Sequence, residues 1–163
     1  FGLIAFIAAL IPVSVVAPIL VFVGMSMIAT AFHSNQARYY PAVALAMLPY
    51  FANYLMTRFN RGAPEVVEGI SSAIGALGQG AMFSAILLGA MCVTVIDRQF
   101  RQATVFALVA AGMAFVGLMH APKLAWYAAP DFVHGYLLMA LFFAWYAWRG
   151  VAPSAPAQAP GAD

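Results

Sequence analysis

Few residues of this chain have the type and spacing that chemistry requires. The three histidines, His33, His120 and His134, have no partner among themselves three or four residues away. Histidine-box oxygenases and zinc proteases need such clusters to fix a metal. The apolar segments also offer no Ser-His-Asp set, no paired carboxylates and no base beside the single thiol, Cys92. The sequence therefore predicts no enzyme, no metal site and no cofactor.

Three polar residues inside otherwise apolar segments are candidates for contact with a solute: Gln79, Asn53 and His134. Gln79 lies in the glycine-rich stretch Gly75–Gly80, which lacks the Gly-Lys-Ser/Thr ending of a phosphate loop and instead favours a broken helix. Broken helices often build the substrate sites of transporters, where unwound backbone faces protein or a water-filled cavity. For Asn53 and His134 the alternative interpretation is ordinary hydrogen bonding between neighbouring helices, and for Gln79 it is ordinary close packing of the helix.

The amino-acid composition indicates whether water or lipid surrounds the chain. Of 163 residues, 65% are hydrophobic and 7% are charged, and the mean hydropathy is +0.92. A soluble domain usually carries about 25% charged residues. The net charge of +2 forms no basic stripe, which disfavours binding to nucleic acid. The composition predicts an integral membrane protein whose main partner is the lipid bilayer.

Prolines, glycines and charged residues divide the chain into about six hydrophobic segments, and no strand alternation occurs. The first 32 residues are uncharged and would extend about 48 Å as one helix, against roughly 30 Å of hydrocarbon. We therefore expect a tight turn at Pro12–Val16, a break of the fourth segment near Gly78, and a disordered tail at 150–163. The predicted spans are 1–11, 17–32, 41–57, 70–96, 103–119 and 132–148. The predicted fold is an all-α, polytopic transmembrane helical bundle, and the chain is expected to be a fragment that begins inside a helix.

The charged residues all fall in predicted loops, helix ends or the tail, and none is placed mid-membrane. An ion-coupled transporter usually holds a carboxylate there, so we expect either a coupling carboxylate upstream of Phe1 or no ion coupling. Basic residues divide almost evenly between the two sides and lean toward a cytoplasmic C-terminal tail. One side carries Arg38, Arg98, Arg101 and Arg149, and the other carries Arg58, Arg61 and Lys123.

Small residues recur at helical spacing in two neighbouring segments. In the first segment, one row consists of Ala81, Ala85 and Gly89, and an adjacent row on the same helix consists of Ala76, Gly80 and Ser84. In the second segment, the row consists of Ala103, Ala107, Ala111, Ala114 and Gly117. Small side chains let helix backbones approach closely in lipid. We expect these two segments to pack closely, against each other.

The stretch Ile11-Pro12 followed by Val16-Ala17-Pro18-Ile19-Leu20-Val21-Phe22-Val23-Gly24-Met25-Ser26-Met27 resembles a late-helix block of the xanthine/uracil/vitamin C permeases, especially their hypoxanthine/adenine-like branch. The stretch Ala37-Arg38-Tyr39-Tyr40-Pro41-Ala42-Val43-Ala44 is similar to the family's next segment. The match covers roughly residues 1–58, and the segments between Gly69 and Met119 are longer than the family's usual ending.

The resemblance implies two inverted repeats of seven helices, which together form a core domain and a gate domain. This chain would be the C-terminal part of the second repeat and would belong mostly to the gate domain. Family members import nucleobases with protons or sodium by moving a core domain against the gate, and no residue here matches their substrate or coupling motifs. We therefore expect a gate and scaffold portion of a secondary transporter for a small polar solute, such as a purine or pyrimidine, in the plasma (inner) membrane. A homodimer is compatible with this expectation. The alternative is a non-transporting structural or sensory membrane subunit.

Overall fold

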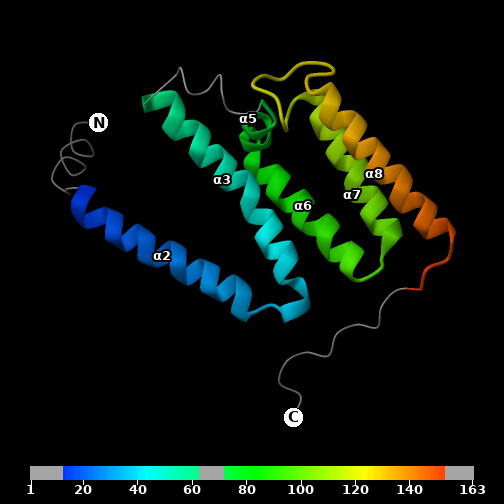
Figure 1. Cartoon of the computed structure of the whole chain (residues 1–163), viewed down its shortest axis with the longest axis horizontal. Coiled ribbons are helices and arrows are strands. Elements are labelled where there is room, and N and C mark those ends of the chain that lie inside the picture. The colour runs from blue at the N-terminus through cyan, green and yellow to red at the C-terminus, as the bar shows by residue number, and fades with distance from the viewer. Residues whose placement is uncertain (1–12, 63–71, 153–163) are drawn as a thin grey trace, which may run out of the picture. The chain divides into compact units, whose positions relative to one another are not determined.

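The computed structural model describes residues 13–62 and 72–152, and every regular element within these ranges is a helix (Figure 1). The predicted all-α class is therefore confirmed. The chain divides into two compact units, residues 1–37 and 38–163, which are described separately. The predicted first span at 1–11 and the predicted tail from residue 153 onward lie outside the described residues.

The first unit contains helix α2 (Val13–His33). Its start corrects the turn predicted at Pro12–Val16, because Val13–Val16 are already helical and Pro18 lies inside the helix. The first four amides of a helix have no internal hydrogen-bond partner in any case. Pro18 comes just after them, so its missing N–H removes only one internal hydrogen bond. Among the described helices, this one alone is both long and apolar enough to cross a bilayer, over Val16–His33, and none of that window is buried.

The described residues of the second unit form five α-helices, preceded by part of the short 3-10 turn η1 (Ala37–Tyr39). The helices are α3 (Tyr40–Gly62), α5 (Ser72–Gly78), α6 (Ala81–Ile96), α7 (Phe100–Val116) and α8 (Pro130–Trp148). The beginning of α3, the end of α6, the beginning of α7 and the end of α8 lie together at one end of this unit (Figure 1).

Two helix ends differ from the prediction for local reasons. Helix α3 continues past the predicted end at Thr57 to Gly62, because arginines are good helix formers and are favourable near a C-terminus. Helix α7 stops at Val116 instead of Met119, because Gly117 is left-handed (φ 82°). The N–H groups of Gly117 and Leu118 then bond to the carbonyls of Ala114 and Met113, which closes the helix.

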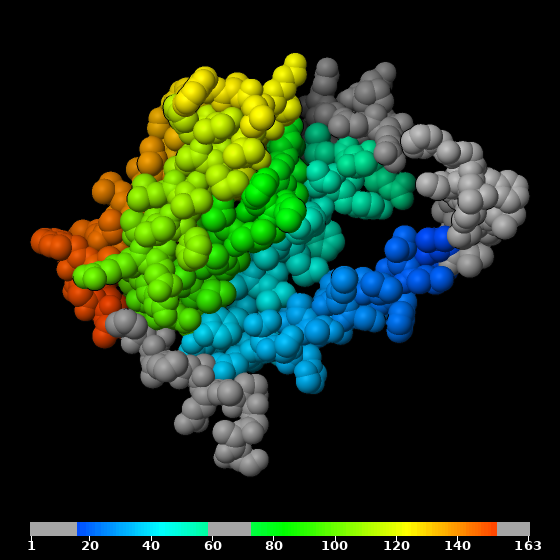
Figure 2. Space-filling model, turned by 180° about the vertical axis from the view of Figure 1, so that it is seen from behind, coloured from blue at the N-terminus to red at the C-terminus, as the bar shows by residue number. Residues whose placement is uncertain are grey.

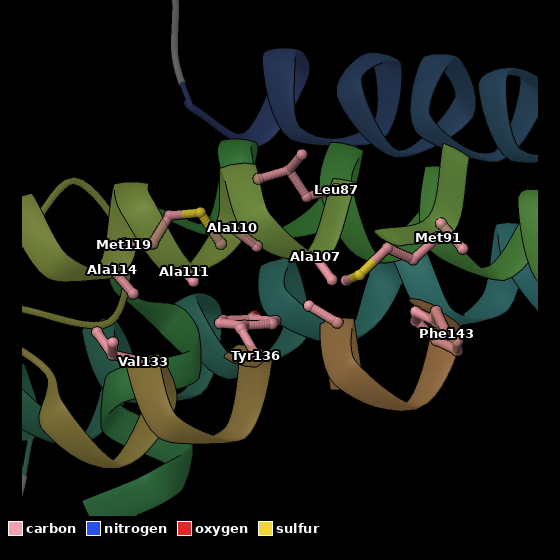
Figure 3. Packing of buried hydrophobic residues seen from close by; sticks show 12 residues of the cluster. Leu87, Met91, Ala107, Ala110, Ala111, Ala114, Met119, Val133, Tyr136 and Phe143 are labelled. Carbon is pink, nitrogen blue, oxygen red and sulfur yellow. The ribbon is translucent and has the colours of Figure 1, made fainter. Parts of the chain in front are cut away.

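The core of the second unit is a seam of alanines between α7 and its neighbours. Ala103, Ala107, Ala110 and Ala114 of α7 are completely buried. Larger side chains close the seam from α6, α8 and the loop after α7, and Figure 3 shows them pointing toward one another. They are Leu87, Met91, Met119, Val133, Tyr136 and Phe143. Alanine side chains allow the helix axes to lie close together.

The predicted small-residue ridges are only partly used as expected. Helix α7 contacts α6, as predicted, but it packs more extensively against α8. The small residues of α6 also pack against α3, because a Cβ placed on Gly89 would lie 3.3 Å from the Cβ of Ala46. The spacing of small residues thus identified faces that pack closely but did not identify every partner.

The outward faces of the helices carry large apolar side chains. On α8, Leu138 and Leu141 are 67% and 69% exposed, and on α7 Val105 is 58% exposed. Figure 2 shows the surfaces of α3, α6 and α7 side by side. Large apolar side chains thus lie on the outward faces as well as in the core, which differs from the pattern expected in water, where the outward face of an amphipathic helix is polar.

One ion pair joins the beginning of α3 to the end of α6. The guanidinium of Arg38 donates to a carboxylate oxygen of Asp97, and the hydroxyl of Tyr39 donates to the same oxygen over 3.0 Å. The pair is half-buried and fixes the register of α3 against α6 at this end of the unit.

Candidate functional site

The candidate site begins at the interruption between α5 and α6. Helix α5 ends at Gly78 and α6 begins at Ala81, so the helix breaks where its glycines predict. Glycine is required at two positions. A Cβ on Gly78 would lie 2.8 Å from the backbone nitrogen of Asn53, and Gly80 is left-handed (φ 67°), with the carbonyl oxygen of Leu118 only 2.4 Å from the place of a Cβ.

Two of the three predicted site residues meet at this break. The side-chain amide of Asn53 donates to the carbonyl oxygen of Gly78 over 2.9 Å and ties α3 to the end of α5. The neighbouring Gln79 holds its side-chain oxygen buried, and that oxygen has no hydrogen-bond partner within the described residues. A buried acceptor without a donor costs free energy, roughly 1–3 kcal/mol, and needs an explanation.

His120 completes the group, although it was not among the predicted site residues. Its backbone N–H donates to the carbonyl of Gln79 over 3.0 Å, and its ring Nδ1 lies 3.1 Å from the carbonyl oxygen of Ala76. Ring Nε2 lies 2.8 Å from the hydroxyl oxygen of Tyr136 on α8. The ring also stacks on Phe132, with centroids 4.0 Å apart. His120 therefore connects the α5–α6 break to α8.

The hydrogen bonds of His120 define its neutral form. Because a carbonyl oxygen can only accept, Nδ1 carries the hydrogen and Nε2 accepts from the hydroxyl of Tyr136. His120 is 4% exposed, and burial lowers the pKa of its imidazole below the usual 6.5. The hydrogen bond to Ala76 opposes this effect on the pKa only in part. A neutral imidazole fits both neighbours without leaving a polar atom unpaired.

A cleft of about 400 Å³ opens beside this histidine, between α5 and the start of α8. His120, Phe132 and the exposed carboxylate of Asp131 supply its polar and aromatic walls. Alanines supply much of the remainder, including Ala73 and Ala76 of α5. A cleft of this size can hold a small molecule. An imidazole, a carboxylate and a flat ring suit a small planar solute with hydrogen-bonding groups.

His134, the third predicted site residue, stands apart from this group. It is exposed in the first turns of α8, and its ring Nε2 lies 3.2 Å from the hydroxyl of Tyr127 in the preceding loop. Asn53 bonds to α5, as the alternative of hydrogen bonding between neighbouring helices predicts for it. His134 bonds instead to a residue of the loop before α8. Sequence reasoning passed over His120 because its partners, Ala76 and Tyr136, are far away in the chain.

Comparison of the chain with protein-family models, with curated proteins and with solved structures gave no match. The resemblance to nucleobase permeases therefore stays a prediction from the sequence.

Proposed function

We propose that this chain is the gate and scaffold portion of an integral membrane transporter for a small polar solute, which the cleft beside the α5–α6 break contacts. The first candidate solutes are purine and pyrimidine nucleobases, carried with a proton or sodium. In this proposal the helices of both units cross the plasma (inner) membrane as a polytopic bundle, with the C-terminal tail in the cytoplasm.

The membrane part of the proposal rests on the exposed apolar faces of the helices of the second unit and on the long apolar helix α2. Large apolar side chains face outward on α3, α6, α7 and α8, where lipid would solvate them and water would not. Trp145 and Trp148, near the end of α8, are of the type that anchors helices at headgroup depth.

The transport part rests on one observation at the helix break. The buried side-chain oxygen of Gln79 has no hydrogen-bond partner among the described residues, and the backbone carbonyl of Gln79 accepts from His120, which lines the cleft. Interrupted helices free backbone and side-chain groups to exchange hydrogen bonds with a solute. The nucleobase as solute is taken from the family resemblance and from the flat, hydrogen-bonding walls of the cleft.

A non-transporting structural or sensory subunit is the second candidate. The observation in its favour is that both ring nitrogens of His120 are already paired with groups of this chain. A site that serves only to join helices would be satisfied in this way.

Uptake decides between the two. Cells that lack endogenous nucleobase uptake and express the full-length protein should accumulate radiolabelled purine or pyrimidine above the empty-vector control. Accumulation that collapses with a protonophore, or without sodium, identifies the coupling ion. No uptake and no binding of any purine or pyrimidine removes the nucleobase proposal. A protein that disperses as a monomer without detergent removes the membrane proposal as well.

A further inference from the structure

A second hollow lies at the opposite end of α7 and α8 from the His120 cleft. It has a volume of about 490 Å³ and is formed where the α6–α7 turn meets the end of α8. Arg98 of the turn and Arg101 of the first turn of α7 line it on one side, and Ala147 of α8 lines it on the other. Two arginines therefore line the same hollow.

Neither arginine has an acidic partner within residues 13–62 and 72–152. The carboxylate of Asp97, which precedes Arg98 in the sequence, is engaged by Arg38 and Tyr39. Both Arg98 and Arg101 are exposed. Guanidinium groups bind phosphate through paired, charge-assisted hydrogen bonds, so this hollow suits a phosphate group.

An apolar extension distinguishes the hollow from a simple phosphate site. An adjoining hollow of about 250 Å³ shares Arg101 and Gln102 with the first and continues along α7 over Val105 and Phe106. The side chain of Val105 is 58% exposed. A ligand that fills both hollows carries an anionic head and a hydrocarbon chain.

We propose that these two hollows bind one anionic phospholipid, with its phosphate between Arg98 and Arg101 and an acyl chain along Val105 and Phe106. The inference rests on the membrane location proposed above, but not on transport. Basic pockets between helices on the cytoplasmic side are a known way to bind anionic headgroups. The neighbouring tryptophans at the end of α8 place this end of the helices at the depth of those headgroups.

The test measures lipid retention on the purified full chain in neutral detergent by native mass spectrometry. Phosphatidylglycerol and phosphatidylcholine of equal chain length are added in turn. We expect selective retention of phosphatidylglycerol, and we expect the Arg98→Asn/Arg101→Gln variant to lose this preference by about tenfold or more, since both positive charges beside the phosphate are removed. Asparagine is chosen because residue 98 is left-handed (φ 56°) and asparagine tolerates that conformation.

Two control variants isolate the pocket from charge and from folding. Lys123→Gln removes one exposed positive charge at the other end of the unit and should keep the preference. Arg101→Lys keeps the charge and should keep most of the preference even if the double variant folds poorly. Equal retention of the two lipids by the unmodified chain overturns the proposal, and so does an unchanged preference in a folded double variant.

Two soluble probes separate a lipid site from a free phosphate site. Inorganic phosphate and glycerol 3-phosphate should each bind far more weakly than phosphatidylglycerol, because neither fills the hollow over Val105 and Phe106. Equal binding of glycerol 3-phosphate overturns the lipid assignment. Retention is read without any transport, so a failure of the uptake assay leaves this result intact, and a loss of lipid preference leaves the uptake result intact.

Discussion

The side-chain nitrogen of Asn53 lies 2.9 Å from the carbonyl oxygen of Gly78 and joins the middle of α3 to the last residue of α5. The approach is close enough that a Cβ on Gly78 would lie 2.8 Å from the backbone nitrogen of Asn53. The carbonyl left open by the end of α5 is thereby satisfied from a neighbouring helix. This contact holds the helix break in place, and several measurable consequences depend on it.

The first consequence is a loss of stability in Asn53→Ala. Removing the amide leaves the carbonyl of Gly78 without this donor, and we expect the free energy of unfolding to fall by about 1 kcal/mol. Denaturant unfolding in detergent micelles measures the change. Asn35→Ala is the matched control, because the Asn35 amide is exposed and bonds locally to Ala31. Equal effects of the two substitutions would contradict a special role for the Asn53–Gly78 contact.

Glycine substitutions should separate into two classes. Gly78→Ala and Gly80→Ala should each destabilise by about 2 kcal/mol or more, because overpacking against backbone and left-handed strain cannot be relieved by side-chain movement. Gly112→Ala and Gly135→Ala, inside α7 and α8, meet no atom within 4 Å. Those two should raise stability by about 0.5–1 kcal/mol, since alanine is the better helix former. Thermal unfolding of the four variants tests the division.

The alanine seam should tolerate no enlargement. Ala107 is completely buried between α7 and its neighbours, so Ala107→Leu should lower the free energy of unfolding by about 1–3 kcal/mol. Ala144→Leu places the same side chain on the exposed face of α8 and should be nearly neutral. If Ala107→Leu unfolds at the temperature of the unmodified protein, the seam is not close-packed.

Acid should weaken the fold through His120. Its pKa is lowered in the folded state by burial, whereas the unfolded histidine titrates near 6.5. Above pH 6.5 both states are neutral and this residue adds no pH dependence. As the pH falls from 6.5 through the folded pKa, the unfolded chain takes up a proton that the folded site resists, so the free energy of unfolding decreases.

Unfolding measured between pH 8 and pH 5 checks this sign. His120→Gln should flatten the slope below pH 6.5, and His134→Gln, at an exposed position, is the matched variant for comparison. A slope that persists in His120→Gln would assign the pH dependence to another group.

Gln79→Met should separate function from stability. The Gln79 oxygen makes no hydrogen bond within the described residues, so an apolar side chain of similar length should cost no stability and can even raise it. If the oxygen accepts a hydrogen bond from solute, uptake in the assay above should fall by about tenfold, as expected for one lost bond of roughly 1.4 kcal/mol. Full uptake by a folded Gln79→Met would remove this residue from the solute path.

Local signals in the sequence predicted the features that depend on local physics. The break near Gly78 follows from three glycines within six residues, and the close-packed faces follow from the spacing of small residues. Helix α2 begins earlier than the proline predicts, because the helix accommodates Pro18 in its second turn and not only in its first.

The centre of the candidate site depends on contacts that no local pattern encodes. His120 is 44 residues from Ala76 and 16 residues from Tyr136 along the chain. Only the fold brings these three together, so the histidine could be recognised from its burial and its partners but not from its neighbours in sequence. The one signal in the sequence was its place beside prolines and aromatic residues in a polar loop, which also fits an unremarkable interfacial histidine.

The contact of Gly80 with the carbonyl of Leu118 has a mechanical consequence. Together with the bond from the His120 amide to Gln79, it clamps the joint between α5 and α6 to the joint after α7. A movement of one joint must therefore either break this hydrogen bond or move the other joint with it, which couples the α5 side of the cleft to the α7–α8 pair.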